Sequence, residues 1–92
     1  MKEVKVLCVC GMGFGTSLML FMNVQDLGKK HGVKVTGEAC DLGSYKGRPC
    51  DVIIASNEIA TQIDGQGKPV LAIKNIIDVN ELEQQVKPYF ED

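Results

Sequence analysis

Short apolar runs alternate with segments of helical periodicity, and this alternation constrains the fold more than any other feature of the sequence. Val4–Val9 is predicted to be a buried strand, because large and β-branched apolar residues dominate it and glycines follow directly. A helix is predicted from Ser17 to about Lys30, with Gly32 as its stop. The apolar residues at near-helical spacing in this helix are Leu18, Met19, Met22 and Leu27.

The second half of the chain continues the alternation. Val33–Cys40 alternates apolar and polar residues, as an edge strand with one solvated face does. The glycine-rich stretch "DLGSYKGRP" predicts an irregular connection with room for one helical turn, and "CDVIIAS" at 50–56 predicts a third, fully apolar strand. Ser56 can cap a short helix over about 57–63, which the turn at 64–67 ends.

The C-terminal part supplies one more strand and one more helix. Pro69–Ile73 is the predicted fourth strand. Asp78, with Glu81 three residues later, resembles a capping box at the start of the last helix. The apolar stripe predicted for that helix consists of Val79, Leu82, Val86 and Tyr89.

These elements predict an α/β fold, a doubly wound four-stranded parallel sheet flanked by helices, with the first strand central. At 92 residues the chain fits one domain over 1–92, with no room for a separate cofactor domain. We expect no cofactor.

Charge and hydropathy exclude several classes of function. A net charge of -2 without a Lys/Arg cluster argues against a nucleic-acid partner. No apolar run approaches the roughly 20 residues of a membrane span, and the start lacks a signal-peptide core, so we expect a cytoplasmic protein. Its four cysteines are then expected to be reduced thiols.

Cys10 follows the first predicted strand and opens a glycine-rich loop. At the carboxyl end of a parallel strand a side chain faces ligand and not core. Three alternating glycines let backbone N–H groups converge on an anion, and the following helix adds its free N–H groups and positive dipole end. The same field stabilises a thiolate. The predicted phosphate-binding residues are Gly11, Met12, Gly13, Phe14, Gly15, Thr16 and Ser17. The alternative is a small buried cysteine before a tight turn.

The spacing of this loop departs from other phosphate loops. It lacks the Gly-Lys-Ser/Thr ending of a P-loop and the G-x-G-x-x-G of a dinucleotide site. Cys10 to Ser17 has the length of a cysteine phosphatase loop, C-x5-R-S/T, but Thr16 stands where arginine would be. Because arginine holds a transferring phosphoryl group bidentately, its absence favours a phosphocysteine that is passed on over one that is hydrolysed.

"VLCVCGMGFGTS", "DVIIASNEIA" and "GKPVLAIKN" together resemble the IIB component of the bacterial phosphoenolpyruvate-dependent sugar phosphotransferase system, ascorbate and galactitol type, with the ascorbate branch most similar. The resemblance covers nearly the whole chain, and its specific part is the loop that starts at Cys10. It implies a fold similar to that of low-molecular-weight tyrosine phosphatases.

The resemblance also implies the partners and the reaction. Cys10 would accept a phosphoryl group from a phosphohistidine of the IIA protein and pass it to a carbohydrate substrate, with ascorbate as the candidate, held by the membrane IIC protein. The chain would then meet the inner face of the membrane transiently, through IIC. A cysteine-dependent phosphatase or arsenate-reductase-like enzyme, and an anion-binding module with an inert thiol, remain as alternatives.

The remaining polar and sulfur-bearing residues have weaker claims. We interpret Cys8 as core and Cys40 and Cys50 as packing residues, and we expect no metal site, because the cysteine spacings lack further paired ligands. His31, at a helix end, is expected to be a solvated cap. None of the acids at element ends, namely Asp41, Asp64 and Asp78, has a strong claim as a general acid. Met12 and Phe14 could pack inward or dock a partner, and docking is slightly favoured.

Overall fold

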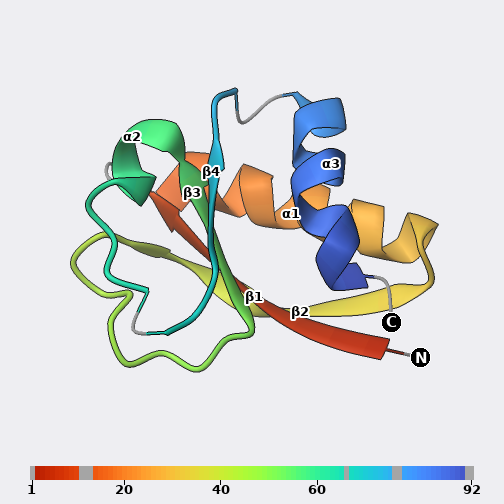
Figure 1. The fold of residues 1–92 in the computed structure, drawn as a ribbon, viewed down its shortest axis with the longest axis horizontal. Helices are drawn as coiled ribbons and strands as arrows, with labels where there is room; N and C mark the ends of the chain where they lie inside the picture. The colour runs from red at the N-terminus through yellow and green to blue at the C-terminus, as the bar shows by residue number, and fades with distance from the viewer. Residues whose placement is uncertain (1, 11–13, 66, 76–77, 91–92) are drawn as a thin grey trace.

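The computed structural model describes residues 2–10, 14–65, 67–75 and 78–90 of the chain (Figure 1). At residues 10 and 14–17 it describes the backbone alone. Strands and helices alternate along most of it. In chain order the elements are β1 (Lys2–Cys10), α1 (Phe14–Lys30), β2 (Val33–Asp41), β3 (Val52–Ser56), α2 (Asn57–Ala60), β4 (Val70–Ile73) and α3 (Val79–Phe90).

The four strands form one parallel sheet in the order β2-β1-β3-β4, which confirms the predicted α/β fold and the interior position of the first strand. β1 pairs with β2 along its whole length, from Lys2 opposite Val33 to Cys10 opposite Asp41. Gly37, with φ +121°, lies in this pairing, where any Cβ would collide with the carbonyl oxygen of Val6. Glycine is therefore required for β2 to approach β1 so closely.

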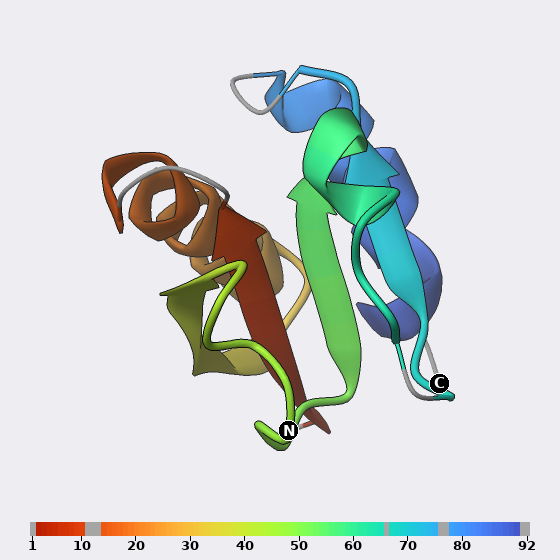
Figure 2. The same cartoon turned by 90° about the vertical axis from the view of Figure 1, so that its left-hand side faces the viewer.

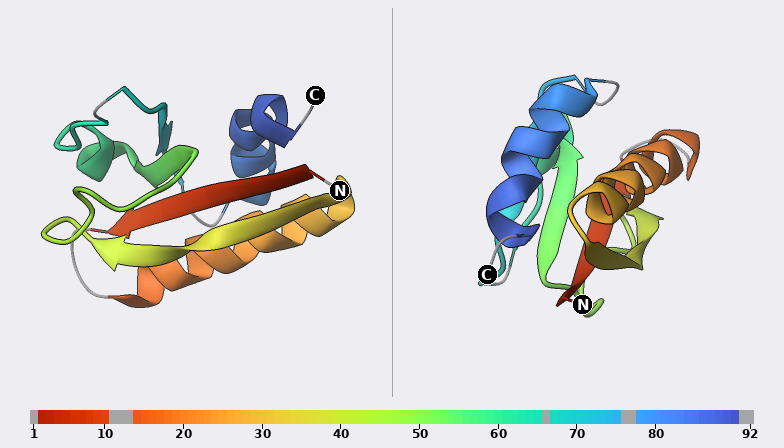
Figure 3. Two further views of the ribbon diagram at one scale, coloured as in Figure 1. Left: turned by 90° about the horizontal axis from the view of Figure 1, so that it is seen from below. Right: turned by 90° about the vertical axis from the view of Figure 1, so that its right-hand side faces the viewer.

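Each face of the sheet carries its own core. The two long helices cover one face (Figure 3), where Val4, Val6, Cys8, Leu20, Val24, Leu27, Val33, Val35, Val52, Ile54, Leu71, Ile73, Leu82, Val86 and Phe90 are buried together. On the other face, α2 and the connections beside it cover Leu7, Val9, Cys40, Tyr45, Ile53 and Ala55. Both faces of the sheet are thus buried, as expected for a parallel sheet.

The predicted first helix forms, but it begins earlier and turns a different face to the core. It starts at Phe14 and not at Ser17, and its buried residues are Leu20, Val24 and Leu27. The orientation of α1 requires glycine at position 28, because a Cβ there would clash with the side chain of Val35 and come within 2.8 Å of the Val33 carbonyl oxygen. Of the residues predicted at helical spacing, only Leu27 is buried, and Leu18, Met19 and Met22 are exposed.

The other two helices also differ in detail from the prediction. α2 ends at Ala60, and Ser56 stands at its N-cap without a side-chain hydrogen bond. Asp78 does cap α3, since its Oδ1 accepts hydrogen bonds from the backbone N–H groups of Asn80 and Glu81. Glu81 does not complete a capping box, because its carboxylate accepts hydrogen bonds from two N–H groups that follow β4 instead.

The stripe predicted for α3 is partly wrong. Leu82 and Val86 are buried, and Tyr89 packs at the edge of the core. Phe90 is the third buried residue, while Val79 is 44% exposed. The connection at 42–51 contains turns and no helix. Among the described residues no helix combines the length and the apolar character that crossing a bilayer would require.

Candidate functional site

Cys10 is the last residue of β1 and lies at the carboxyl edge of the sheet. Its strand is interior, between β2 and β3, and this edge is visible where the strands end beside the start of α1 (Figure 2). The chain leaves β1 toward β2 on one side, while β3 leads to β4 on the other. Ligands of open parallel sheets bind where the strand order reverses in this way. Cys10 therefore stands at the position that the fold favours for a site.

α1 begins only four positions after Cys10, at Phe14. The predicted loop residues Phe14, Gly15, Thr16 and Ser17 thus form the first turn of the helix, while Gly11, Met12 and Gly13 lie outside the described residues. A glycine in the first turn costs about 1 kcal/mol relative to alanine. Burial of one face of α1 offsets this cost. The helix propensity of the residues takes no account of burial, so the sequence predicted a start that was too late.

The early helix start places an anion-binding group near Cys10. The first four N–H groups of a helix have no intrahelical acceptor, and in α1 they belong to residues 14–17. No acidic residue lies in the first turn, and Lys29 and Lys30 lie in the last turn, in the order that the helix dipole favours. The sequence from Val6 to Gln25 contains no charged residue. Within this segment only backbone groups could hold an anion.

The other three cysteines are free thiols in environments that suppress the thiolate. Cys8 is fully buried in the core, and burial raises its pKa far above the ordinary value. Burial also raises the pKa of Cys40, against the nearby Arg48 guanidinium, which lowers it. The Cys50 thiol is partly buried, and burial raises its pKa against the opposing effect of Lys68. The expectation that Cys8 is core and Cys40 is a packing residue is confirmed.

Asp41 is the acid that the structure brings to Cys10, since the two residues are paired at the ends of β1 and β2. Its Oδ1 is buried and has no hydrogen-bond partner among the described residues. Asp78 caps α3, and the backbone N–H of Asp64 donates to the Tyr45 hydroxyl at 2.9 Å. Sequence reasoning ranked all three alike, because the register of two strand ends is not visible in one sequence.

His31 is exposed directly after the end of α1, as predicted, but its ring contacts α3, which the sequence did not indicate. Its Nε2 lies 2.9 Å from Glu83 Oε2 of α3, and its ring lies 5.9 Å from that of Phe90. Lys30 Nζ lies 3.0 Å from the same Glu83 oxygen. These contacts join the end of α1 to α3. The sequence did not predict them, because the residues lie far apart in the chain.

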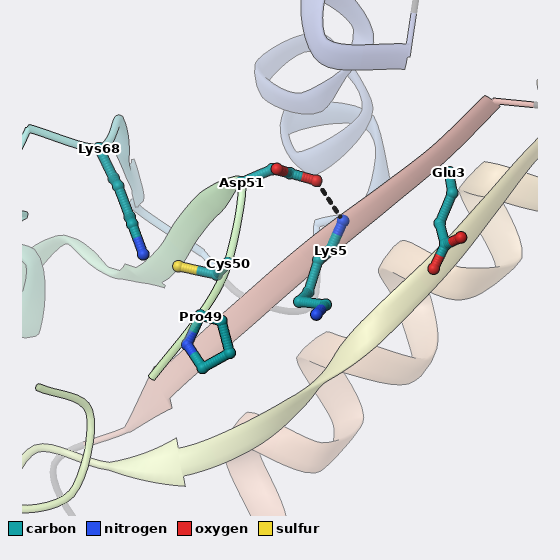
Figure 4. A pocket seen from close by; sticks show the side chains of 6 residues that line it. All are labelled: Glu3, Lys5, Pro49, Cys50, Asp51 and Lys68. Atoms are coloured by element: carbon teal, nitrogen blue, oxygen red, sulfur yellow. Dashed lines mark hydrogen bonds between the residues drawn. The ribbon is translucent and has the colours of Figure 1, made fainter. Parts of the chain in front are cut away.

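A cavity of about 410 Å³ lies at the amino end of β3, away from Cys10 (Figure 4). Its lining residues are Glu3, Lys5, Pro49, Cys50, Asp51 and Lys68. Two of its polar side chains are committed to the backbone: Asp51 Oδ2 accepts the Lys5 N–H at 2.8 Å, and Lys68 Nζ donates to the Arg48 carbonyl oxygen at 3.4 Å. The charges that face the cavity are of both signs. We favour the Cys10 edge as the functional site, since there the fold, the helix start and a thiol coincide.

Comparison with known proteins shows the family of the chain. The family model described as "PTS system, Lactose/Cellobiose specific IIB subunit" matches residues 5–88, which include Cys10 and the start of α1. A protein of Mycoplasma pneumoniae named "Ascorbate-specific PTS system EIIB component" is 29% identical over 86 residues, 90% of this chain and 90% of the relative. Proteins of the same name from Salmonella choleraesuis and Shigella flexneri are 35% identical over 77 residues, covering 80% of this chain and 76% of each relative.

Proposed function

Because the chain belongs to the IIB subunit family of the phosphotransferase system, which has a role in sugar phosphotransfer, we propose that Cys10 is its phosphoryl acceptor. The donor is a phosphohistidine on a IIA protein, and the acceptor is a carbohydrate held by the membrane protein IIC. The observation that carries the proposal is the place of Cys10 at the carboxyl end of an interior strand, four positions before a helix whose first turn has no acidic residue.

The chemistry needs two displacements at phosphorus. First the Cys10 thiolate attacks, the P–N bond of phosphohistidine breaks, and the departing imidazole nitrogen takes up a proton. Then a substrate hydroxyl attacks, the S–P bond breaks, sulfur leaves as the thiolate, and the hydroxyl proton passes to a base. Backbone N–H groups at the start of α1 stabilise the phosphoryl oxygens in both steps. The proposed phosphate-binding residues are Gly11, Met12, Gly13, Phe14, Gly15, Thr16 and Ser17.

For the substrate we propose ascorbate, because several relatives are named as ascorbate-specific components. The family description names lactose and cellobiose. Membranes that contain the cognate IIC protein would discriminate these sugars. We expect phosphate from phosphorylated Cys10 to reach ascorbate and not lactose or cellobiose.

The acceptor assignment is tested by intact-mass measurement after incubation with phosphoenolpyruvate, the general phosphotransferase proteins and IIA. We expect the protein to gain one phosphoryl group, and Cys10→Ser to gain none. Cys50→Ser is the matched control, since it removes a partly buried thiol at the other end of the sheet, and it should still be phosphorylated. A phosphorylated Cys10→Ser protein would show that the nucleophile is another residue.

The phosphatase alternative makes the opposite prediction for hydrolysis. Thr16 provides a hydroxyl at the loop position where a phosphatase has the bidentate guanidinium of arginine, so we expect little hydrolysis. Sustained turnover of aryl phosphates that depended on Cys10 would favour a phosphatase over a carrier.

A further inference from the structure

Three large apolar side chains are exposed on the first half of α1. Leu18 is 50% exposed, Met19 is 40% exposed and Met22 is 55% exposed. At 3.6 residues per turn they fall within about 100° of the helix circumference. Leu20, Val24 and Leu27 occupy the opposite side and are buried. We call Leu18, Met19 and Met22 the α1 apolar surface.

This surface is not an ordinary scatter of exposed apolar groups. Among the described residues the only other large hydrophobic side chain with comparable exposure is Val79, on α3. The surface begins about one turn after Phe14, where α1 follows Cys10. Asp26, one turn beyond Met22, is exposed, and its charge marks the end of the apolar surface. Grouped exposed apolar side chains that border a site indicate a contact with another protein.

We propose that the α1 apolar surface docks the soluble IIA donor when it brings its phosphohistidine to Cys10. The inference rests on the proposed function, because a docking surface beside the thiol is needed only if Cys10 receives its phosphoryl group from another protein. Transfer requires the two proteins to meet around Cys10, and the surface is continuous with the start of the helix that follows this residue.

The size and composition of the surface favour this occupant. A stable complex buries about 800 Å² per partner, far more than three half-exposed side chains supply, so a second copy of the chain would be held weakly. A phosphoryl donor must dissociate after every transfer. A small contact area allows this, because it gives a weak complex. Methionine side chains repack easily against a changing partner. Two of the three residues are methionines.

The lack of charge on this segment argues against an anionic lipid surface as the occupant. A surface that works close to anionic lipid gains from lysine and arginine. The segment from Val6 to Gln25 carries neither. The surface is therefore suited to an apolar patch on a soluble protein.

The test is the initial rate of phosphorylation of this protein as a function of the concentration of phosphorylated IIA. For Leu18→Gln and Met22→Gln we expect the half-saturating donor concentration to rise about tenfold, since each loses an apolar contact. The maximal rate and the final stoichiometry should stay unchanged. Val79→Gln makes the same kind of change at an equally exposed residue of another helix and should leave the half-saturating concentration unaltered. Circular dichroism and thermal unfolding verify that each variant is folded.

The outcomes separate this inference from the proposed function. If the unmodified protein gains no phosphoryl group, the proposed function fails. If it is phosphorylated but both α1 variants saturate at its donor concentration, docking at this surface is wrong. If only onward transfer to IIC slows, the surface belongs to the transporter. If sedimentation shows self-association that Met22→Gln abolishes, the occupant is a second copy, and the donor assignment is overturned.

Discussion

Cys10 differs from the other cysteines in its surroundings and not in its chemistry. It ends a strand beside a helix start, whereas Cys8 and Cys40 lie in the two cores of the sheet. A helix N-terminus favours the charged thiolate, while burial favours the neutral thiol. We therefore expect Cys10 to be reactive and Cys8 and Cys40 to be inert.

Alkylation rates should report this difference directly. In Cys50→Ser protein we expect the iodoacetamide reaction of Cys10 to reach half its maximal rate below pH 8.5, the ordinary thiol pKa of about 8.5 being lowered by the helix start. Cys50, followed by peptide mapping in Cys10→Ser protein, should titrate above its ordinary range, because burial raises the pKa of the Cys50 thiol. A Cys10 profile like that of a model thiol would remove the argument for an anion-binding helix start.

At the scale of elements, one carboxylate joins the two long helices. Glu83 of α3 accepts from His31 and pairs with Lys30, both at the end of α1. The hydrogen bond from His31, and then that from Lys30, holds the pKa of Glu83 below its ordinary value. A carboxyl group with a lowered folded-state pKa stabilises the fold above its unfolded pKa of about 4.3, and this contribution is lost as pH falls through the folded value.

Glu83→Gln should therefore lower stability near neutral pH and make little difference at strongly acidic pH. The measurement is the urea midpoint of the variant and the unmodified protein between about pH 3 and pH 7, where the unfolded pKa lies. The difference should shrink in high salt, because the ion pairs are partly exposed. Glu58→Gln, on α2, is the control. A difference that did not vary with pH would mean that Glu83 acts through packing and not through charge.

At the scale of the whole molecule, the sheet connects two cores that would otherwise be separate. β3 is its centre of burial, since Ile54 faces the core under α1 and α3 while Ile53 and Ala55 face the other. Ile54 is fully buried and stands opposite Cys8 and Leu71 of the neighbouring strands. A cavity at this position should lower the stability of the whole fold.

Ile54→Ala should cost about 2–5 kcal/mol of unfolding free energy, because the close-packed sheet cannot collapse into the space left. Ile59→Ala, which truncates a partly buried residue of α2, should cost less. Urea unfolding followed by circular dichroism gives both values. Equal losses in the two variants would contradict the central role of β3.

Most of the strands and helices could be predicted from local sequence patterns. The run Val4–Val9, the edge pattern of Val33–Cys40 and the apolar segment before Ser56 each predict a strand from a short window, and each forms one. The capping role of Asp78 was likewise predictable, since it depends on neighbours two and three positions away. Periodicity and capping are local properties, so one sequence suffices to read them.

Packing decided the rest. Two apolar stripes of α1 satisfy the helical period equally well, and packing against the sheet, with Gly28 in close approach to β2, buries Leu20 and Val24 and leaves Met22 exposed. The pairing of Cys10 with Asp41 depends on strand register across the sheet. Thus the sequence by itself determined the strands, the helices and the candidate thiol, while the tertiary structure decided which strand ends meet beside Cys10 and which side chains face solvent, because these depend on contacts between segments far apart in the chain.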